Sequence, residues 1–183
     1  PMSARRQRQM CIRDSSTGIC FIGERPFPEF VGSYLSGEEG NIINENDDVI
    51  GIHQGLVFYT LGQRQGLGIG GVKGSPDLPW YVAKKNLKTN ELLCVQGNDH
   101  PLLFSRELST KNLFKLEDSL PTSFEGTAKV RYRQEDQGCE IYVEDNALNI
   151  KFHKPQRSVT PGQSVVIYKN DKCLGGGEIC TIN

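Results

Sequence analysis

The second half of the sequence is a series of short β-prone segments at even spacing, and this pattern most constrains the fold. Residues 127–133, 140–143, 148–152, 164–168 and 173–179 are rich in β-branched and aromatic side chains. Turn-forming pairs punctuate them, at 137–138, 145–146, 161–162 and 170–171. Evenly spaced strands predict a small sandwich or barrel, and we expect a C-terminal antiparallel β-barrel over residues 104–183.

The preceding part of the chain also favours strands over helices. Residues 49–52, 56–60, 80–83 and 92–95 read as strands separated by glycine clusters, which predicts a small central domain over residues 39–103. Before it, residues 19–22 predict a short buried strand. Pro26 then fits the first turn of a helix. The fold class expected is mostly β with little helix.

Residues 1–15 do not continue this pattern. They are basic and lack apolar periodicity, and nothing in them resembles a turn or cap leading into Ser16. A disordered basic tail and an arm that touches RNA are two interpretations. We favour a third, in which the segment resembles translated adapter sequence and is not native, so that it is set aside in reasoning about the fold.

The composition is typical of a soluble globular protein, and the cysteine pattern indicates a reducing compartment. Hydrophobic residues make up 37% and charged residues 23%, and no signal peptide or membrane span is predicted. The six cysteines form no CxxC pair, which argues against a zinc site or a disulfide scaffold and favours the cytoplasm. A net charge of −1 excludes a globally basic nucleic-acid binder but leaves room for a local basic patch.

Cys20 is the candidate nucleophile. It lies in a short apolar run flanked by Gly18 and Gly23, just before the expected helix start and five residues ahead of Arg25. Nearby cations and helix N-termini favour the thiolate. The alternative is a buried structural cysteine, which is the commoner role of a lone cysteine in an apolar run.

A glycine-rich stretch at residues 66–71 could in principle cradle phosphates. No Lys-Ser/Thr pair and no helical pattern follows it, so a tight turn between strands is favoured. His53 could act as a base or a metal ligand. The three histidines are not spaced for a metal site, and none is predicted.

The run Lys129-Val-Arg-Tyr-Arg is the clearest electrostatic feature. Alternate residues of a strand share a face, so Lys129, Arg131 and Arg133 are expected to form a cationic row. Such a row suits phosphate contacts, and Tyr132 could stack or pack. A solvated strand face balanced by the acidic residues at 135–136 is the alternative.

Several motifs in order resemble the tRNA-specific 2-thiouridylase family from about residue 16 to the end. They are residues 16–25 (STGICFIGER), 53–56 (HQGL), 60–71 (TLGQRQGLGIGG), 79–82 (PWYV), 130–134 (VRYRQ), 160–164 (TPGQS) and 173–177 (CLGGG). The cysteine motif and the glycine-rich motif are long and specific.

The resemblance implies an ATP-dependent sulfurtransferase that thiolates the wobble uridine of tRNA at C2. Cys20 matches the cysteine that carries a persulfide, and the cysteine pair of the family ends as a disulfide. Arg131, Tyr132 and Gln163 match positions implicated in tRNA contact, with Lys129 and Arg133 as weaker candidates. ATP is the implied substrate of the complete enzyme, and a sulfur-donor or sulfur-relay protein is an implied partner.

Parts of the family pattern have no counterpart in this sequence. The family's N-terminal ATP-binding domain and its second catalytic cysteine are not found, so residues 16–38 are interpreted as the tail of an α/β catalytic domain. Ser15 stands where the family usually has Asp, and Cys11 falls in the segment set aside. We therefore expect a C-terminal fragment that is inactive alone.

Two other functions remain open at this point. The chain could be a stand-alone RNA-binding β-barrel module in which Cys20 is structural. It could also be a barrel that docks other proteins without RNA.

Overall fold

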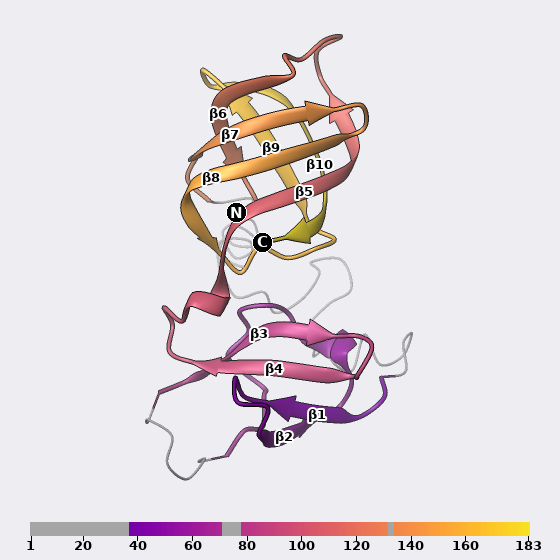
Figure 1. Cartoon of the computed structure of the whole chain (residues 1–183), viewed down its shortest axis with the longest axis vertical. Coiled ribbons are helices and arrows are strands. Elements are labelled where there is room, and N and C mark those ends of the chain that lie inside the picture. The colour runs from indigo at the N-terminus through magenta and orange to yellow at the C-terminus, as the bar shows by residue number, and fades with distance from the viewer. Residues whose placement is uncertain (1–36, 71–77, 132–133) are drawn as a thin grey trace, which may run out of the picture.

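The computed structural model describes residues 37–70, 78–131 and 134–183, which form two β-sheet units (Figure 1). The smaller unit contains β1 (Gly40–Ile43), β2 (Val49–His53), the 3-10 helix η1 (Leu56–Phe58), β3 (Trp80–Asn86) and β4 (Glu91–Gln96). The larger unit follows the 3-10 helix η2 (Pro101–Leu103). Its strands are β5 (Phe104–Lys115), β6 (Ser123–Lys129), β7 (Gln137–Glu144), β8 (Ala147–Arg157), β9 (Ser164–Lys169) and β10 (Lys172–Ile182).

The smaller unit is a four-stranded mixed sheet in the order β2-β1-β4-β3. Strands β1 and β4 pair in parallel, whereas the two outer pairs are antiparallel. One face of the sheet is apolar because alternate residues, such as Ile42 and Leu92, point inward. The segment that follows η1 packs against this face and adds Leu67 to the same core.

The larger unit is a closed barrel of six antiparallel strands in the order β10-β5-β8-β7-β6-β9. Its interior is filled by apolar side chains that alternate with outward residues along each strand. The fully enclosed members include Ile141, Ile150, Val165 and Ile167. Strand β10 pairs with both β5 and β9 and so closes the ring.

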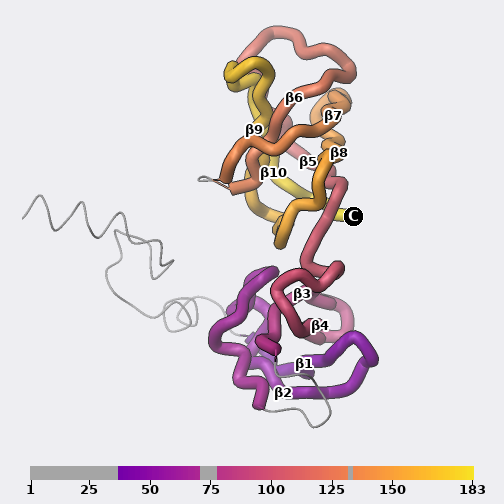
Figure 2. The backbone as a smooth tube through the Cα atoms, turned by 90° about the vertical axis from the view of Figure 1, so that its left-hand side faces the viewer, coloured from indigo at the N-terminus to yellow at the C-terminus, as the bar shows by residue number. Residues whose placement is uncertain are grey.

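The two units lie one above the other along the long axis and are joined by η2 and the start of β5 (Figures 1 and 2). Leu103 is buried at the junction together with Tyr81 and Val95. The Arg157 guanidinium lies 5.1 Å from the centroid of the Tyr81 ring, and Arg157 Nε donates to the Asn98 carbonyl at 3.3 Å. Side chains from the barrel therefore contact the smaller sheet directly.

The predicted fold class is confirmed: the described chain is mostly β, with a closed antiparallel barrel after a smaller sheet. Three local predictions are wrong. Residues 56–60 are not a strand, because Gly55 has φ 126° and the Phe58 amide bonds back to the Gly55 carbonyl at 3.1 Å. Residues 137–138 begin β7 instead of forming a turn. The strand predicted over residues 127–133 is also wrong in its extent, because β6 ends at Lys129.

The longest strand, β5, was not among the predicted segments. Its sequence contains four charged residues and the exposed apolar side chain of Phe114, so it lacks a clean alternation. The strand and helix expected before residue 37 lie outside the described residues.

Candidate nucleic-acid interface

Arg131 lies two residues beyond the end of β6. Val130 is buried in the barrel core, and the chain then turns so that Arg131 faces outward. Its Nη2 donates to the Ser158 carbonyl at 3.1 Å. A guanidinium has five N–H donors, so within the described part of the chain most donors of Arg131 remain available while the side chain is held in place.

A ladder of glutamine side chains supports the segment that carries Arg131. Gln134 Oε1 accepts from the Val130 amide at 3.0 Å, and Gln134 Nε2 donates to Gln156 Oε1 at 2.7 Å. Gln156 is 4% exposed and donates in turn to Gln137 Oε1 at 3.2 Å. Burying a side-chain amide costs free energy unless it is hydrogen-bonded. The ladder satisfies these amides and so holds the segment after β6 in place.

Gln163 lies at the end of a tight turn that faces Arg131. The Gln163 amide bonds to the Thr160 carbonyl at 3.2 Å, which closes a four-residue turn. Pro161 presets its own φ, and Gly162 has φ 86°, which is the combination that a type II turn requires. The side-chain amide of Gln163 is exposed and has no partner within the described part of the chain.

Arg131 and Gln163 line one hollow of about 600 Å³ between the ends of β6 and β9. We call it the Arg131 hollow. Its lining residues come from the end of β6, the turn and the outward face of β9: Lys129, Val130, Arg131, Gly162, Gln163, Ser164, Val166 and Tyr168. None of these carries a negative charge, so the hollow presents cations, amides and an aromatic edge together.

Lys129 shares the hollow, but it is not the free cation that the sequence suggested. Its Nζ lies 2.7 Å from Asp136 Oδ1 and 5.5 Å from the centroid of the Tyr168 ring. The hydrogen bond that Lys129 donates to Asp136 raises the pKa of Lys129. The expected row of three cations on one strand face is wrong, because β6 ends at Lys129 and Arg131 points out of the following turn.

Cys20, Tyr132 and Arg133 lie outside the described residues, so their assigned roles stay predictions.

Tyr168 was missed by reasoning from the sequence. The alternation along β9 places Ser164, Val166 and Tyr168 on its outward face, and this pattern could have found it.

His53 is a structural residue of the smaller sheet. It is fully buried, its Nδ1 accepts from the Gly55 amide at 3.0 Å, and its Nε2 lies 3.1 Å from the Asn90 carbonyl. These contacts assign the proton to Nε2. With both ring nitrogens occupied, His53 has no free position for a base or a ligand.

In the glycine-rich stretch, residues 65–66 form a turn, and the described residues 67–70 have no regular secondary structure. Among residues 37–70, 78–131 and 134–183, no three His, Cys, Asp or Glu side chains are grouped to hold a metal ion. The cysteines in these ranges are all free thiols. No helix in them is long and apolar enough to span a bilayer.

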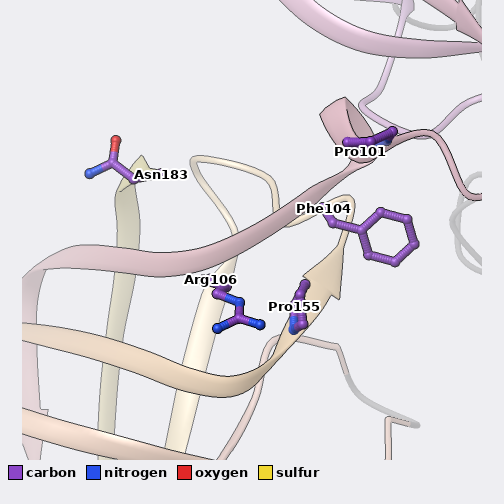
Figure 3. A pocket seen from close by; sticks show the side chains of 5 residues that line it. All are labelled: Pro101, Phe104, Arg106, Pro155 and Asn183. Carbon is purple, nitrogen blue, oxygen red and sulfur yellow. The ribbon is translucent and has the colours of Figure 1, made fainter.

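Two other hollows lie near the junction of the units. Figure 3 shows one of about 470 Å³, lined by Pro101, Phe104, Arg106, Pro155 and Asn183. The other, of about 450 Å³, contains Lys84 and Lys85 among apolar side chains. Neither brings together the residues predicted from the sequence, so the Arg131 hollow is the stronger candidate site.

The fold and this hollow define a β-barrel protein with a surface suited to anionic, hydrogen-bonding ligands. A family profile described as "tRNA methyl transferase PRC-barrel domain" matches residues 28–96. A second, described as "Aminomethyltransferase beta-barrel domain", matches residues 105–179.

Curated relatives identify the family more specifically. The tRNA-specific 2-thiouridylase MnmA of Francisella tularensis subsp. tularensis (strain WY96-3418) is 55% identical over 169 residues, covering 91% of this chain and 47% of the relative. The MnmA protein of F. tularensis subsp. novicida (strain U112) is 54% identical over the same length. The chain belongs to the tRNA-specific 2-thiouridylase family, and it spans about half the length of the curated relatives it matches.

Proposed function

We propose that this chain supplies a tRNA-binding surface of a tRNA-uridine 2-sulfurtransferase, with the Arg131 hollow as the contact site. The observation that carries the proposal is the convergence of Arg131 and Gln163, which are 32 positions apart in the sequence, on one hollow. A planar guanidinium suits a phosphate, and a free amide can bond to a phosphate, a ribose hydroxyl or a base edge. Tyr132 and Arg133 follow Arg131 directly and are proposed to extend the contact.

In the complete enzyme, ATP would adenylate the C2 oxygen of the wobble uridine and release pyrophosphate. The terminal sulfur of a persulfide on Cys20 would then attack C2, and AMP would leave with the oxygen. A second cysteine would attack the Cys20 sulfur, so that the terminal sulfur stays on the uridine and the two cysteines form a disulfide. We place this reaction in the cytoplasm, with a sulfur-donor or sulfur-relay protein forming the persulfide.

The binding part of the proposal is tested by measuring the affinity for an unmodified tRNA transcript over a salt series. Arg131→Glu is expected to weaken binding. It should also reduce the salt slope, which is the dependence of the logarithm of the binding constant on the logarithm of salt concentration, by the amount that corresponds to about one phosphate contact. Lys88→Glu makes the same charge change in the turn between β3 and β4 and serves as the matched control. Equal effects of the two variants would show that only net charge matters, which would count against the Arg131 hollow.

The catalytic part is tested with ATP, tRNA and a sulfur-donor protein that already carries a persulfide, because that donor supplies sulfur at the oxidation level that the Cys20 persulfide requires. The 183-residue chain alone is expected to form no 2-thiouridine, whereas the complete enzyme should form it and Cys20→Ser in that enzyme should not. Product formation by the chain alone would contradict its proposed inactivity. Full activity of Cys20→Ser would remove the persulfide role and leave the RNA-binding role in place.

A further inference from the structure

A second hollow, which Phe114 lines, adjoins the Arg131 hollow on the outside of the barrel, because Ser164 and Val166 line both. It has a volume of about 440 Å³, and we call it the Phe114 hollow. The residues that matter are Phe114 near the end of β5, Leu116 just after that strand, and the three glycines at 175–177 of β10. Phe114 is 65% exposed, so its ring lies largely in solvent although burial of such a ring is favourable.

Strand register connects this ring to the Arg131 hollow. Lys129 of β6 pairs with Val166 of β9, Val166 pairs with Gly176 of β10, and Gly176 pairs with Phe114 of β5. Paired residues of neighbouring strands lie on the same face, so these four form one row across the outside of the barrel. The row spans three strand spacings, a path of about 14 Å along the curved barrel wall. Ser164 and Val166 line both hollows.

Between Lys129 and Phe114, the barrel surface lacks a side chain at Gly176. A Cβ atom on Gly176 would lie 2.3 Å from the Val165 carbonyl oxygen, and one on Gly175, where φ is 144°, would lie 2.1 Å from the Phe114 carbonyl oxygen. Close packing of the backbone therefore excludes larger residues here. The result is a flat strip of bare backbone beside an exposed aromatic ring.

The charges around the strip do not oppose an anionic ligand. Glu178 is the acidic residue among those that line the Phe114 hollow, and Lys111 Nζ lies 2.9 Å from its Oε1. Its charge is thus compensated within the described part of the chain. An aromatic platform continuous with a cationic hollow is the combination by which proteins bind single-stranded nucleic acid.

We propose that Phe114 stacks on an unpaired base of the same RNA whose backbone is bound at the Arg131 hollow. This inference rests on the proposed function, and it adds a stacking residue on β5 that neither the sequence motifs nor the comparisons assign. The glycine strip lets the sugar-phosphate chain cross β10 closely enough for a base to reach the ring. The exposed Leu116 extends the apolar edge of the platform.

The test measures the affinity of the chain for an unmodified tRNA transcript and for a short single-stranded oligouridine. Phe114→Ala is expected to weaken binding about 5- to 100-fold without changing the salt slope, because stacking involves no counterion release. Phe114→Trp should retain binding, and the added indole fluorescence, taken as the difference from the parent protein, should be quenched by RNA. Tyr142→Ala, which removes a 45% exposed aromatic ring on β7, is the matched control and should bind normally.

The outcomes separate this inference from the proposed function. If Arg131→Glu weakens binding and Phe114→Ala does not, the stacking role is wrong and the tRNA-binding role survives. If neither variant has an effect, or the parent protein does not bind, both are wrong. If Phe114→Ala converts a dimer to a monomer in sedimentation and leaves RNA affinity unchanged, a second copy of the chain covers the ring and the inference fails.

Discussion

The carbonyl oxygen of Ser158 accepts a hydrogen bond from Arg131 Nη2 at 3.1 Å, while the Ser158 amide donates to the Leu103 carbonyl at 2.7 Å. One residue thus connects the candidate RNA contact to the junction between the two units. Ser158 is 5% exposed and has φ 52°, a left-handed conformation that a serine adopts at a cost. Its hydroxyl is buried without a partner in the described structure.

Ser158→Gly is expected to stabilise the fold by about 1 kcal/mol, because it relieves the left-handed backbone and removes an unpaired buried hydroxyl. Both backbone hydrogen bonds remain, so tRNA affinity should not change. Urea denaturation measures the first effect. Ser164→Gly in β9 is the matched control and should lower stability, since glycine is unfavourable inside a strand. A loss of stability in Ser158→Gly would contradict the strain assigned to this position.

Gln156→Leu is expected to cost about 1–3 kcal/mol of stability, because Gln134 and Gln137 would each lose a partner in the ladder. The segment that carries Arg131 should loosen as well, so tRNA affinity should fall with stability. Gln54→Leu, at an exposed position, is the control. Unchanged tRNA affinity in a destabilised Gln156→Leu protein would show that the ladder supports the barrel without positioning Arg131.

Asp136→Asn is expected to strengthen tRNA binding several-fold at low salt and to increase the salt slope. The change releases Lys129 from its ion pair and removes a carboxylate beside the Arg131 hollow. Asp145→Asn in the turn between β7 and β8 makes the same charge change elsewhere. If both variants behave alike, Lys129 does not become a phosphate contact when it is freed.

Stability is expected to fall as the pH rises above about 9. Burial raises the pKa of the Cys94 and Cys139 thiols to about 12, from an ordinary value of 9.0. Between these values the unfolded chain loses protons that the folded chain keeps, so each thiol lowers the free energy of unfolding by up to about 1.4 kcal/mol per pH unit. Urea denaturation of the parent protein and of Cys94→Ala between pH 8 and 10.5 should show a shallower decline in the variant. Parallel declines would contradict the assignment to Cys94.

Lys85 should react with amine-selective reagents at lower pH than Lys111. Partial burial lowers the pKa of Lys85, whereas the hydrogen bond that Lys111 donates to Glu178 raises the pKa of Lys111. The amine that is neutral at lower pH is nucleophilic there, so the pH midpoint of labelling should differ between the two. Mass spectrometry after limited acetylation across pH 7–11 measures both midpoints in one sample. Coincident midpoints would contradict the burial effect.

The sequence predicted the barrel because its signals there are local. The Pro161-Gly162 turn and the alternation along β9 follow directly from residue type. The position of Arg131 could not be predicted in this way, because the nearby Gln134 is held by Gln156, which lies 22 positions further along the chain. The row from Lys129 to Phe114 likewise needs the register of four strands, and single-strand patterns do not specify register.

Because β10 contributes one edge to β5 and the other to β9, a ribosome must release residues 172–182 before the ring can close. Until then the nascent barrel presents two unpaired strand edges, which are sites for intermolecular pairing. Chains shortened by even this one strand should therefore accumulate as aggregates or be removed by quality control. Closure of the barrel is consequently all-or-none with respect to the eleven residues of β10.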